Sequence, residues 1–379
     1  MDHLTNAHLP HGEVVNCQLT RGTIPRMVQR DVVIVGAGPS GLAAAIACQR
    51  RGLDFEVIEK GVLVNSIQHF PPHMVFFTTP ELMEIGGLPF VSPYEKPTRL
   101  EALRYYRRVV EALRLPVTLG EAVESIERQP DGALIVRTRP PSLPTTGPGS
   151  YGAASRPEAG QQADARAEVR LLGARAVVLA IGYYDHPNLL GVPGEDLPHV
   201  SHYYSEAHPF FRKRVVVVGG GNSAAETALE LYRSGAHVTL VHRGAGMSES
   251  IKYWVLPDIR NRISEGSIAA RFETRVVEIT PEAVVLEREG PREAVPADAV
   301  FLLTGYHPDQ DFLQRCGVEL EPGTCMPLHD RETLETNVPN IFLAGGVISG
   351  HDTAPVFIEN GRLHGEKVVG LVAARLGKQ

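Results

Sequence analysis

The sequence predicts an α/β fold with two units of one kind, because a single pattern occurs twice in its 379 residues. Residues 31–60 read DVVIVGAGPSGLAAAIACQRRGLDFEVIEK, and residues 214–243 read RVVVVGGGNSAAETALELYRSGAHVTLVHR. The copies align without a gap. Each has a β-branched apolar run typical of a buried parallel strand, a glycine-rich turn, a helical pattern and a second apolar run. This order is that of a Rossmann-like βαβ unit, which binds a dinucleotide.

Each glycine turn supplies three small residues with separate roles. In the first copy, Gly36 makes the tight turn, Gly38 lets the backbone approach a pyrophosphate, and Gly41 lets the helix pack on its strand. The phosphates then lie at a helix N-terminus, where free N–H groups and the helix dipole favour anions. The equivalent residues of the second copy are Gly219, Gly221 and Ala224. We expect further cofactor contacts from Pro39, Ser40, Asn222 and Ser223.

The copies differ at the end of the second strand, where a ribose is recognised. Glu59 ends the first copy, and a carboxylate there accepts hydrogen bonds from ribose hydroxyls and repels a 2′-phosphate. The second copy has His242 and Arg243, and an arginine binds a phosphate in bidentate fashion. The first copy is therefore expected to bind FAD or NAD, and the second NADPH with help from Lys252. Because Lys60 follows Glu59, one basic residue does not decide the matter alone.

Patterns outside the two copies complete the expected architecture. Residues 98–113 have helical spacing after Thr98 as a cap, and residues 116–138 and 167–181 alternate as strands around a Pro/Gly/Ala/Ser loop. A late apolar strand ends in Ala344-Gly345-Gly346 and is expected to open a helix. The expected units are a flexible arm at 1–30, an FAD-binding domain at 31–206 and 306–379, and an inserted NADPH-binding domain at 207–305.

Composition restricts the partners and the compartment. The net charge of −7 disfavours a nucleic-acid surface, and no apolar run reaches the ~18 residues that a membrane span requires. The N-terminus lacks the charged and apolar segments of a secretory signal. No CxxC spacing suggests a disulfide framework, and no metal site is expected. We expect a cytoplasmic protein without a metal, and a homo-oligomer.

Several long and unusual stretches resemble a known family. The order of the pieces, with AIG at 180–182 and TGYHPD at 304–309, is similar to that of thioredoxin-reductase-like flavoproteins. More narrowly, the chain resembles the YpdA family of bacillithiol disulfide reductases. The stretches that carry this resemblance are NSIQHFPPHMVFFTT (65–79), EIGGLPF (84–90), HYYSEAHPFF (202–211), SESIKYWVLPDI (248–259) and DTAPVFIENGRLHGE (352–366).

The resemblance implies a reaction and further site residues. In that family NADPH reduces FAD, and the flavin reduces a low-molecular-weight disulfide or a small redox protein. His351 and Asp352 follow the C-terminal glycine turn and are the expected catalytic pair, since a histidine can move the proton that accompanies two-electron chemistry. The segments placed near the cofactors add His73, Val123, Gly182, Gly305 and Gly345 as expected contacts.

The chain departs from the family at the reactive cysteine, which is expected just before the third glycine of the first turn. Ser40 stands there, and a serine hydroxyl cannot form a mixed disulfide. Residues 200–214 also lack the redox CxxC of thioredoxin reductases. None of the four cysteines, Cys17, Cys48, Cys316 and Cys325, is expected to be the redox residue. Three alternatives stay open: a ferredoxin, quinone or diaphorase-type reductase, a flavin monooxygenase, and a redox-sensing protein that binds FAD and NADPH without turnover.

Overall fold

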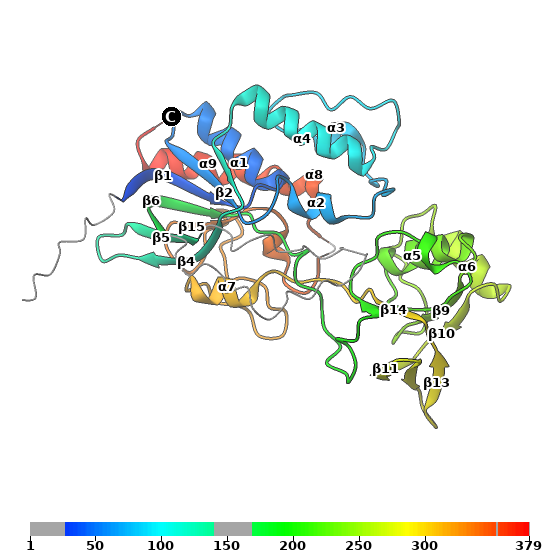
Figure 1. Ribbon diagram of the computed structural model, residues 1–379. Coiled ribbons are helices and arrows are strands. Elements are labelled where there is room, and N and C mark those ends of the chain that lie inside the picture. The colour runs from blue at the N-terminus through cyan, green and yellow to red at the C-terminus, as the bar shows by residue number, and fades with distance from the viewer. Residues whose placement is uncertain (1–26, 140–168, 354, 379) are drawn as a thin grey trace, which may run out of the picture.

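The computed structural model describes residues 27–139, 169–353 and 355–378, which form two domains side by side (Figure 1). Most of the expected N-terminal arm and the expected loop between the strands lie outside the described residues. Each of the two repeated patterns forms the strand, helix and strand at the centre of one domain. The expected α/β class with two Rossmann-like domains is therefore confirmed.

The first domain is built on a seven-stranded sheet in the order β3-β2-β1-β6-β5-β4, with β15 beside β6. Strands β1, β2, β3, β6 and β15 run parallel, whereas β4 and β5 pair antiparallel. The strand β1 begins at Val28, within the last residues of the expected arm at 1–30. The bounds are β1 Val28–Val35, β2 Phe55–Glu59, β3 Val117–Leu119, β4 Ala122–Arg128, β5 Leu134–Arg139, β6 Arg170–Leu179 and β15 Ile341–Leu343.

Helices cover this sheet, with α1, α4 and α9 on one side and α7 on the other (Figure 1). Thr98 caps α4 through a capping box with Glu101, as its sequence predicts. The chain after β15 forms a 3-10 helix at Gly345–Ser349, so the expected helix does not open directly at the glycines. The helices are α1 Pro39–Arg50, α2 Asn65–His69, α3 Pro80–Met83, α4 Arg99–Leu113, α7 Gln310–Arg315, α8 Ile358–Gly361 and α9 His364–Arg375.

The second domain has a five-stranded parallel sheet in the order β10-β9-β8-β14-β7, and an antiparallel sheet β11-β12-β13 beside it. The strand β7 pairs with β14, so this sheet includes residues ahead of the expected boundary at 207. The strands are β7 Val200–Ser201, β8 Arg214–Val218, β9 His237–Val241, β10 Ala269–Arg271, β11 Arg275–Ile279, β12 Ala283–Glu287, β13 Glu293–Pro296 and β14 Ala299–Leu302. The helices are η1 His208–Phe210, α5 Asn222–Arg233 and α6 Leu256–Ser264.

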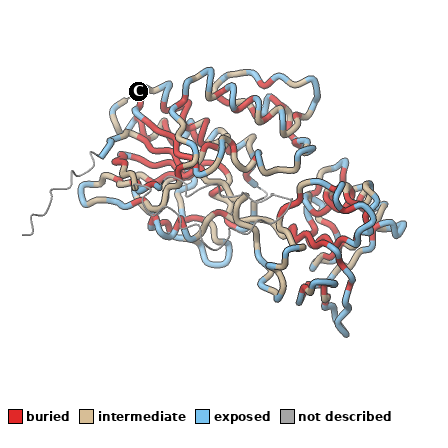
Figure 2. The backbone as a smooth tube through the Cα atoms, in the orientation of Figure 1, coloured by how far each residue is buried: buried red, intermediate tan, exposed pale blue. Residues whose placement is uncertain are grey.

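Each domain has its own hydrophobic core, and Figure 2 shows the central strands buried and the outer helix faces exposed. Val32, Val33 and Ile34 of β1 are fully buried because helices and loops cover both faces of the sheet. Gly41 allows the tightest contact, since a Cβ there would lie 1.9 Å from the Gly36 carbonyl oxygen. No helix in the described part of the chain is long and apolar enough to cross a membrane.

Two chain segments connect the domains, and they pair with each other. Pro187 and Tyr306 form an antiparallel bridge, and the Asn188 N–H donates to the Gly305 carbonyl at 2.9 Å. The His307 N–H donates to the His186 carbonyl at 2.9 Å. The connection is therefore a two-stranded ribbon, which places both glycine turns on the same cavity.

Candidate active site

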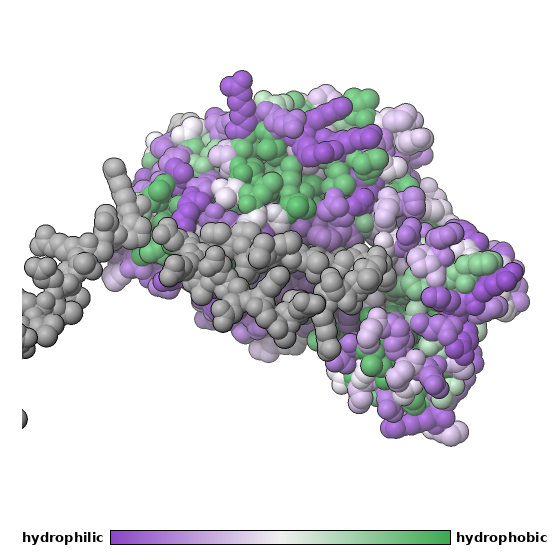
Figure 3. Space-filling model, viewed as in Figure 1, coloured by the Kyte–Doolittle hydropathy of each residue, from purple (hydrophilic) through white to green (hydrophobic). Residues whose placement is uncertain are grey.

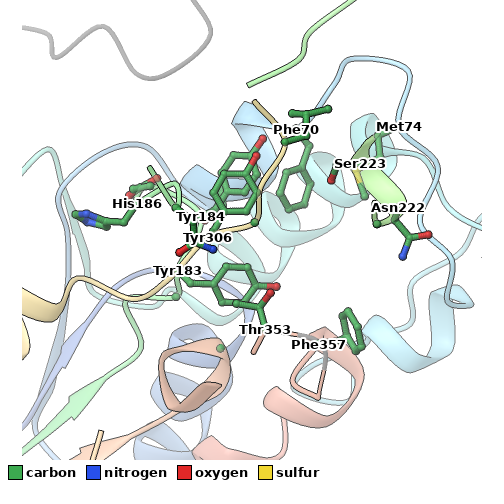
Figure 4. Close-up of a pocket in the computed structure, with 18 of the residues that line it drawn as sticks. Phe70, Met74, Tyr183, Tyr184, His186, Asn222, Ser223, Tyr306, Thr353 and Phe357 are labelled. Carbon is green, nitrogen blue, oxygen red and sulfur yellow. The ribbon is translucent and has the colours of Figure 1, made fainter. Parts of the chain in front are cut away.

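One large cavity lies between the domains and has a volume of about 2040 Å³. Both glycine turns, both connecting segments and the C-terminal turn contribute to its lining. Figure 4 shows Tyr184 and Tyr306 beside Phe70, with Asn222 and Ser223 of the second glycine turn across the space. The expected site residues that line this cavity are Gly36, Gly38, Pro39, Ser40, Glu59, Lys60, His73, Val123, Gly182, Gly219, Gly221, Asn222, Ser223, His242, Arg243, Lys252, Gly305, His351 and Asp352.

Glu59 lies at the carboxyl end of β2 and is only 6% exposed. Its two carboxylate oxygens accept hydrogen bonds from the N–H groups of Ala37 and Gly61, each at 2.8 Å. Burial raises the pKa of the Glu59 carboxyl, and the two N–H donors oppose that shift. Each carboxylate oxygen keeps a second lone pair, so the group fits a ribose hydroxyl. Lys60 is held by Asp185 at 2.8 Å.

Ser40 is the second residue of α1, which follows the first glycine turn, and it packs against the C-terminal turn. A Cβ built on Gly345 would lie 2.3 Å from the Ser40 Oγ, and one on Gly361 would lie 3.1 Å from it. The Gly345 N–H donates to His364 Nδ1 at 3.1 Å, so this amide is not free for a cofactor. Gly345 itself does not line the cavity, although its neighbours Ala344 and Gly346 do. Gly41 and Ala224 are buried and do not line the cavity, as the close packing of a helix on its strand requires.

The second glycine turn is equally tight. Gly219 has φ +150°, and a Cβ there would lie 2.4 Å from the Leu303 carbonyl oxygen. The ring of His242 lies over Gly220, where a Cβ would come within 2.4 Å of its Cε1 atom. Burial lowers the pKa of the His242 imidazole, and the charge of Arg243 adds to that shift. A neutral His242 is thus a weaker phosphate ligand than the sequence suggests.

Basic side chains around the end of β9 are not equivalent. Arg243 is exposed and makes no ion pair within the described residues. The Lys252 ammonium is instead bound to the Glu226 carboxylate at 2.5 Å, and its side chain is 8% exposed. Lys252 therefore lines the cavity with its charge paired to Glu226, and its contact with a 2′-phosphate stays a prediction.

The expected catalytic pair, His351 and Asp352, is exposed at the cavity. The His351 ring lies 5.7 Å from the His307 ring, which lies 5.9 Å from that of His186. His186 faces Asp309 at 3.5 Å, and burial lowers the pKa of its imidazole. The three rings form a row at the ribbon between the domains. The sequence could not indicate that His186 belongs to this row, because its ring partners are distant in the chain.

A tyrosine cluster, which sequence reasoning missed, closes one side of the cavity. The ring of Tyr184 lies 4.8 Å from that of Tyr306 and 5.3 Å from that of Tyr203. Phe70 packs on Tyr184 at 4.9 Å in an edge-to-face arrangement (Figure 4). Tyr183 packs on the other side, against Gly346. The only available signal was the repeated tyrosine in GYYDH (182–186) and the single one in TGYHPD.

The three described cysteines lie away from the cavity. Cys48 and Cys316 are buried, and burial raises the pKa of each thiol to about 12. Cys325 is partly exposed. None of these three residues lines the cavity. Cys17 lies outside the described residues. The described residues also contain no group of three or more His, Cys, Asp or Glu side chains that could hold a metal.

The cavity residues fit two dinucleotides. The helices α1 and α5 each begin at a glycine turn that faces the same space. The strand β2 ends in a carboxylate, and the matching strand β9 is followed by an arginine that forms no ion pair with a described residue. When bound, FAD accepts two electrons from NADPH and passes them to an acceptor.

Comparison with known proteins identifies the family. A model described as pyridine nucleotide-disulphide oxidoreductase matches residues 33–145 and 160–345. The chain is 40% identical over 351 residues to bacilliredoxin reductase Bdr of Bacillus subtilis, covering 92% of this chain and 99% of that protein. The structure of bacillithiol disulfide reductase Bdr (YpdA) from Bacillus cereus is similar, with a TM-score of 0.83, 39% identity, and coverage of 92% and 99%. The Staphylococcus aureus counterpart has a TM-score of 0.80, 36% identity and the same coverage. The chain therefore belongs to the pyridine nucleotide-disulphide oxidoreductase family, as an FAD-containing, NADPH-dependent oxidoreductase similar to Bdr.

Proposed function

We propose that this enzyme reduces a low-molecular-weight disulfide of the bacillithiol type with electrons from NADPH, and that no protein thiol takes part. The overall reaction is NADPH + H⁺ + RSSR → NADP⁺ + 2 RSH. One S–S bond breaks, two S–H bonds form, and NADPH supplies the electron pair and one hydrogen. The second proton comes from water through a side chain of the cavity.

The observation that carries this proposal is the place of Ser40. It occupies the position in the first glycine turn where the family's reactive cysteine is expected, and it lines the cavity. A serine hydroxyl is not ionised at neutral pH and forms no mixed disulfide. Cys48 and Cys316 cannot replace it, because they are buried with thiol pKa values near 12. Electrons therefore leave the enzyme from the cavity itself.

The choice of a small disulfide follows from this geometry and from the names of the relatives. The Bacillus subtilis relative is named a bacilliredoxin reductase, and the two solved structures are named bacillithiol disulfide reductases. A protein disulfide would normally be reduced by exchange with a thiolate at the enzyme surface. A small disulfide instead enters a cavity of about 2040 Å³ that two dinucleotides share. We therefore favour the low-molecular-weight acceptor over the small redox protein.

We assign FAD to the first glycine turn and NADPH to the second. Gly38 and the start of α1 would face the FAD pyrophosphate, and Glu59 would accept from the adenosine ribose. Gly221 and the start of α5 would face the NADPH pyrophosphate, with Arg243 at the 2′-phosphate. The supporting contacts of the FAD site are proposed from Pro39, Ser40, Lys60, His73, Val123 and Gly182. Those of the NADPH site are proposed from Asn222, Ser223, His242 and Gly305.

We assign the proton supply to His351 with Asp352. Both side chains are exposed and line the cavity, so they exchange protons with water while remaining near the acceptor. His307 lies beside His351 and leads inward to His186. This row runs from the exposed His351 to the half-buried His186 along the edge of the cavity.

A second candidate is a reductase for ferredoxin, a quinone or another acceptor that needs no thiol. The same observation favours it, because Ser40 removes the disulfide-exchange group and leaves electron input intact. The two candidates differ only in the acceptor.

We also propose that the protein is a cytoplasmic homo-oligomer. Figure 3 shows hydrophobic surface gathered on the first domain, whereas the second domain is more polar on this face. The exposed large apolar residues of the first domain include Val62, Leu82, Val91, Leu100 and Leu119. Light scattering on the purified protein tests this, and a monomer at micromolar concentration would refute it.

Steady-state NADPH consumption with a panel of acceptors tests the function. We expect bacillithiol disulfide to support turnover with one NADPH consumed per two thiols formed. Turnover only with ferredoxin or a quinone would favour the second candidate. Oxygen-dependent hydroxylation of a substrate would indicate a monooxygenase, and absence of turnover with every acceptor would indicate a redox-sensing protein.

A further inference from the structure

We propose that Arg275 is a second ligand of the NADPH 2′-phosphate and forms a two-arginine clamp with Arg243. The two residues are distant in the sequence: Arg243 lies in the turn after β9, and Arg275 is the first residue of β11. This inference rests on the assignment of Arg243 to the 2′-phosphate.

Backbone hydrogen bonds bring the two arginines to the same place. The Thr274 N–H donates to the His242 carbonyl at 3.1 Å, and the Glu273 N–H donates to the Gly244 carbonyl at 2.9 Å. The segment before β11 therefore runs directly beside the turn that follows β9. Arg243 and Arg275 flank this contact, and both line the cavity.

The charge of Arg275 is available, unlike those of its basic neighbours. Arg275 is exposed and forms no ion pair with another described residue. By contrast, Arg271 is bound to Glu293 at 2.9 Å, and Arg288 is bound to Glu273 at 2.5 Å. Lys252 is bound to Glu226.

Glu287 is the carboxylate that would be the natural partner of Arg275, because it lies directly opposite in the antiparallel pair of β11 and β12. Glu287 is instead paired with Arg292, whose Nε lies 3.2 Å from its carboxylate. Arg275 is thus left to face the cavity beside a second unpaired cation. Two like charges held close by the backbone repel each other, and a dianion between them removes that repulsion.

The chemical consequence is selectivity between the two nicotinamide dinucleotides. A 2′-phosphate presents three acceptor oxygens, which allow two guanidinium groups to bind at once. NADH has a neutral 2′-hydroxyl there and leaves both cations unpaired. Arg275 therefore acts as a specificity-determining residue rather than as a general contact for the adenosine.

The test is an equilibrium titration of the FAD-loaded enzyme with 2′,5′-ADP and with 5′-AMP, which differ by the 2′-phosphate. We expect Arg275→Gln to weaken 2′,5′-ADP binding by about tenfold or more, the usual range for a charge-assisted hydrogen bond, and to leave 5′-AMP binding unchanged. Arg275→Lys should recover part of the loss, because the charge is kept. Arg288→Gln is the matched control, since it removes an exposed arginine directly after the adjacent strand β12 that is already paired with Glu273.

The double variant Arg243→Gln/Arg275→Gln tests the clamp itself. If both arginines bind the same phosphate, their effects on affinity are coupled. The fold loss of 2′,5′-ADP affinity in the double variant should then differ, beyond experimental error, from the product of the two single-variant losses. The inference is overturned if Arg275→Gln leaves 2′,5′-ADP binding unchanged, if it weakens 5′-AMP binding equally, or if Arg243→Gln alone has no effect on 2′,5′-ADP binding. The titration contains no electron acceptor, so a failure of the proposed disulfide reduction does not affect its result.

Discussion

Ser40 and Gly345 are in contact across the two halves of the first domain, since a Cβ on Gly345 would lie 2.3 Å from the Ser40 Oγ. Ser40 belongs to the first glycine turn, and Gly345 belongs to the turn after β15. Position 40 is therefore confined by backbone, and it lines the cavity at the same time. The residue type at this one position decides whether the enzyme has a thiol beside its cofactor.

Ser40→Cys is expected to add a thiol route to the enzyme. A cysteine at the N-terminus of α1 has a lowered thiol pKa, because the helix dipole and free N–H groups stabilise the thiolate. We expect a thiolate–flavin charge-transfer band after two-electron reduction, and faster reduction of bacillithiol disulfide. Absorbance spectra under anaerobic conditions and steady-state rates measure both effects.

Ser40→Ala is the matched control for that experiment. It should keep FAD and change NADPH-driven reduction only modestly, since the lost contact is one hydrogen bond of about 1 kcal/mol. If Ser40→Cys shows neither the band nor a faster rate while retaining FAD, then position 40 does not face the reacting part of the cavity.

Arg243→Ala is expected to reduce the preference for NADPH over NADH. The loss of a charge-assisted contact with the 2′-phosphate costs about 1.5–3 kcal/mol, or roughly ten- to a hundredfold in affinity. The ratio of kcat/KM for the two dinucleotides measures this. Arg260→Ala is a suitable control, because Arg260 is exposed and paired with Glu249. An unchanged ratio in Arg243→Ala would show that the 2′-phosphate binds elsewhere.

Glu59 is expected to make the stability of the FAD-free protein depend on pH. Burial raises the pKa of this carboxyl in the folded state, so its contribution to stability is complete below the unfolded pKa and is lost as pH rises through the folded value. The stability advantage of the wild type over Glu59→Gln should therefore be larger at pH 4 than at pH 8. Urea unfolding at both values measures it, and an advantage that grows with pH would contradict the assignment of a raised pKa.

Gly365 is expected to be required for the packing of α9 on α1. A Cβ there would lie 2.4 Å from the Ala44 backbone nitrogen, so Gly365→Ala should destabilise the protein by about 1–3 kcal/mol. Gly370→Ala is the same change in the same helix, where the nearest atom would be 3.6 Å away. It should be neutral or stabilising by up to about 1 kcal/mol, because alanine favours a helix. Thermal unfolding compares the two, and equal effects would refute the packing argument.

Local patterns were sufficient for much of the fold and for half of the site. The glycine turns, the Thr98 cap and the buried Glu59 follow from short-range rules, because strand, turn and helix signals act within a few residues. The pairing of Pro187 with Tyr306 could not be predicted, since the two connecting segments come together only after both domains have folded.

The same limit applies to side-chain partners that are distant in the sequence. The sequence does not indicate that Lys252 pairs with Glu226 of α5. Arg275 was not suggested at all, because its approach to Arg243 depends on the register between the turn after β9 and the start of β11. The tyrosine cluster likewise joins residues from three separate segments.

The most direct test of disulfide reduction without a protein thiol uses a variant with all four cysteines changed to alanine. The enzyme is reduced with NADPH without oxygen and mixed with bacillithiol disulfide in a stopped-flow instrument. We predict that the flavin absorbance is bleached by NADPH and returns on mixing at the wild-type rate. If the quadruple variant does not retain FAD, the four single variants are measured in the same way. Loss of reoxidation by the disulfide in a variant that is still bleached by NADPH would show that a cysteine carries the electrons, and would contradict the account.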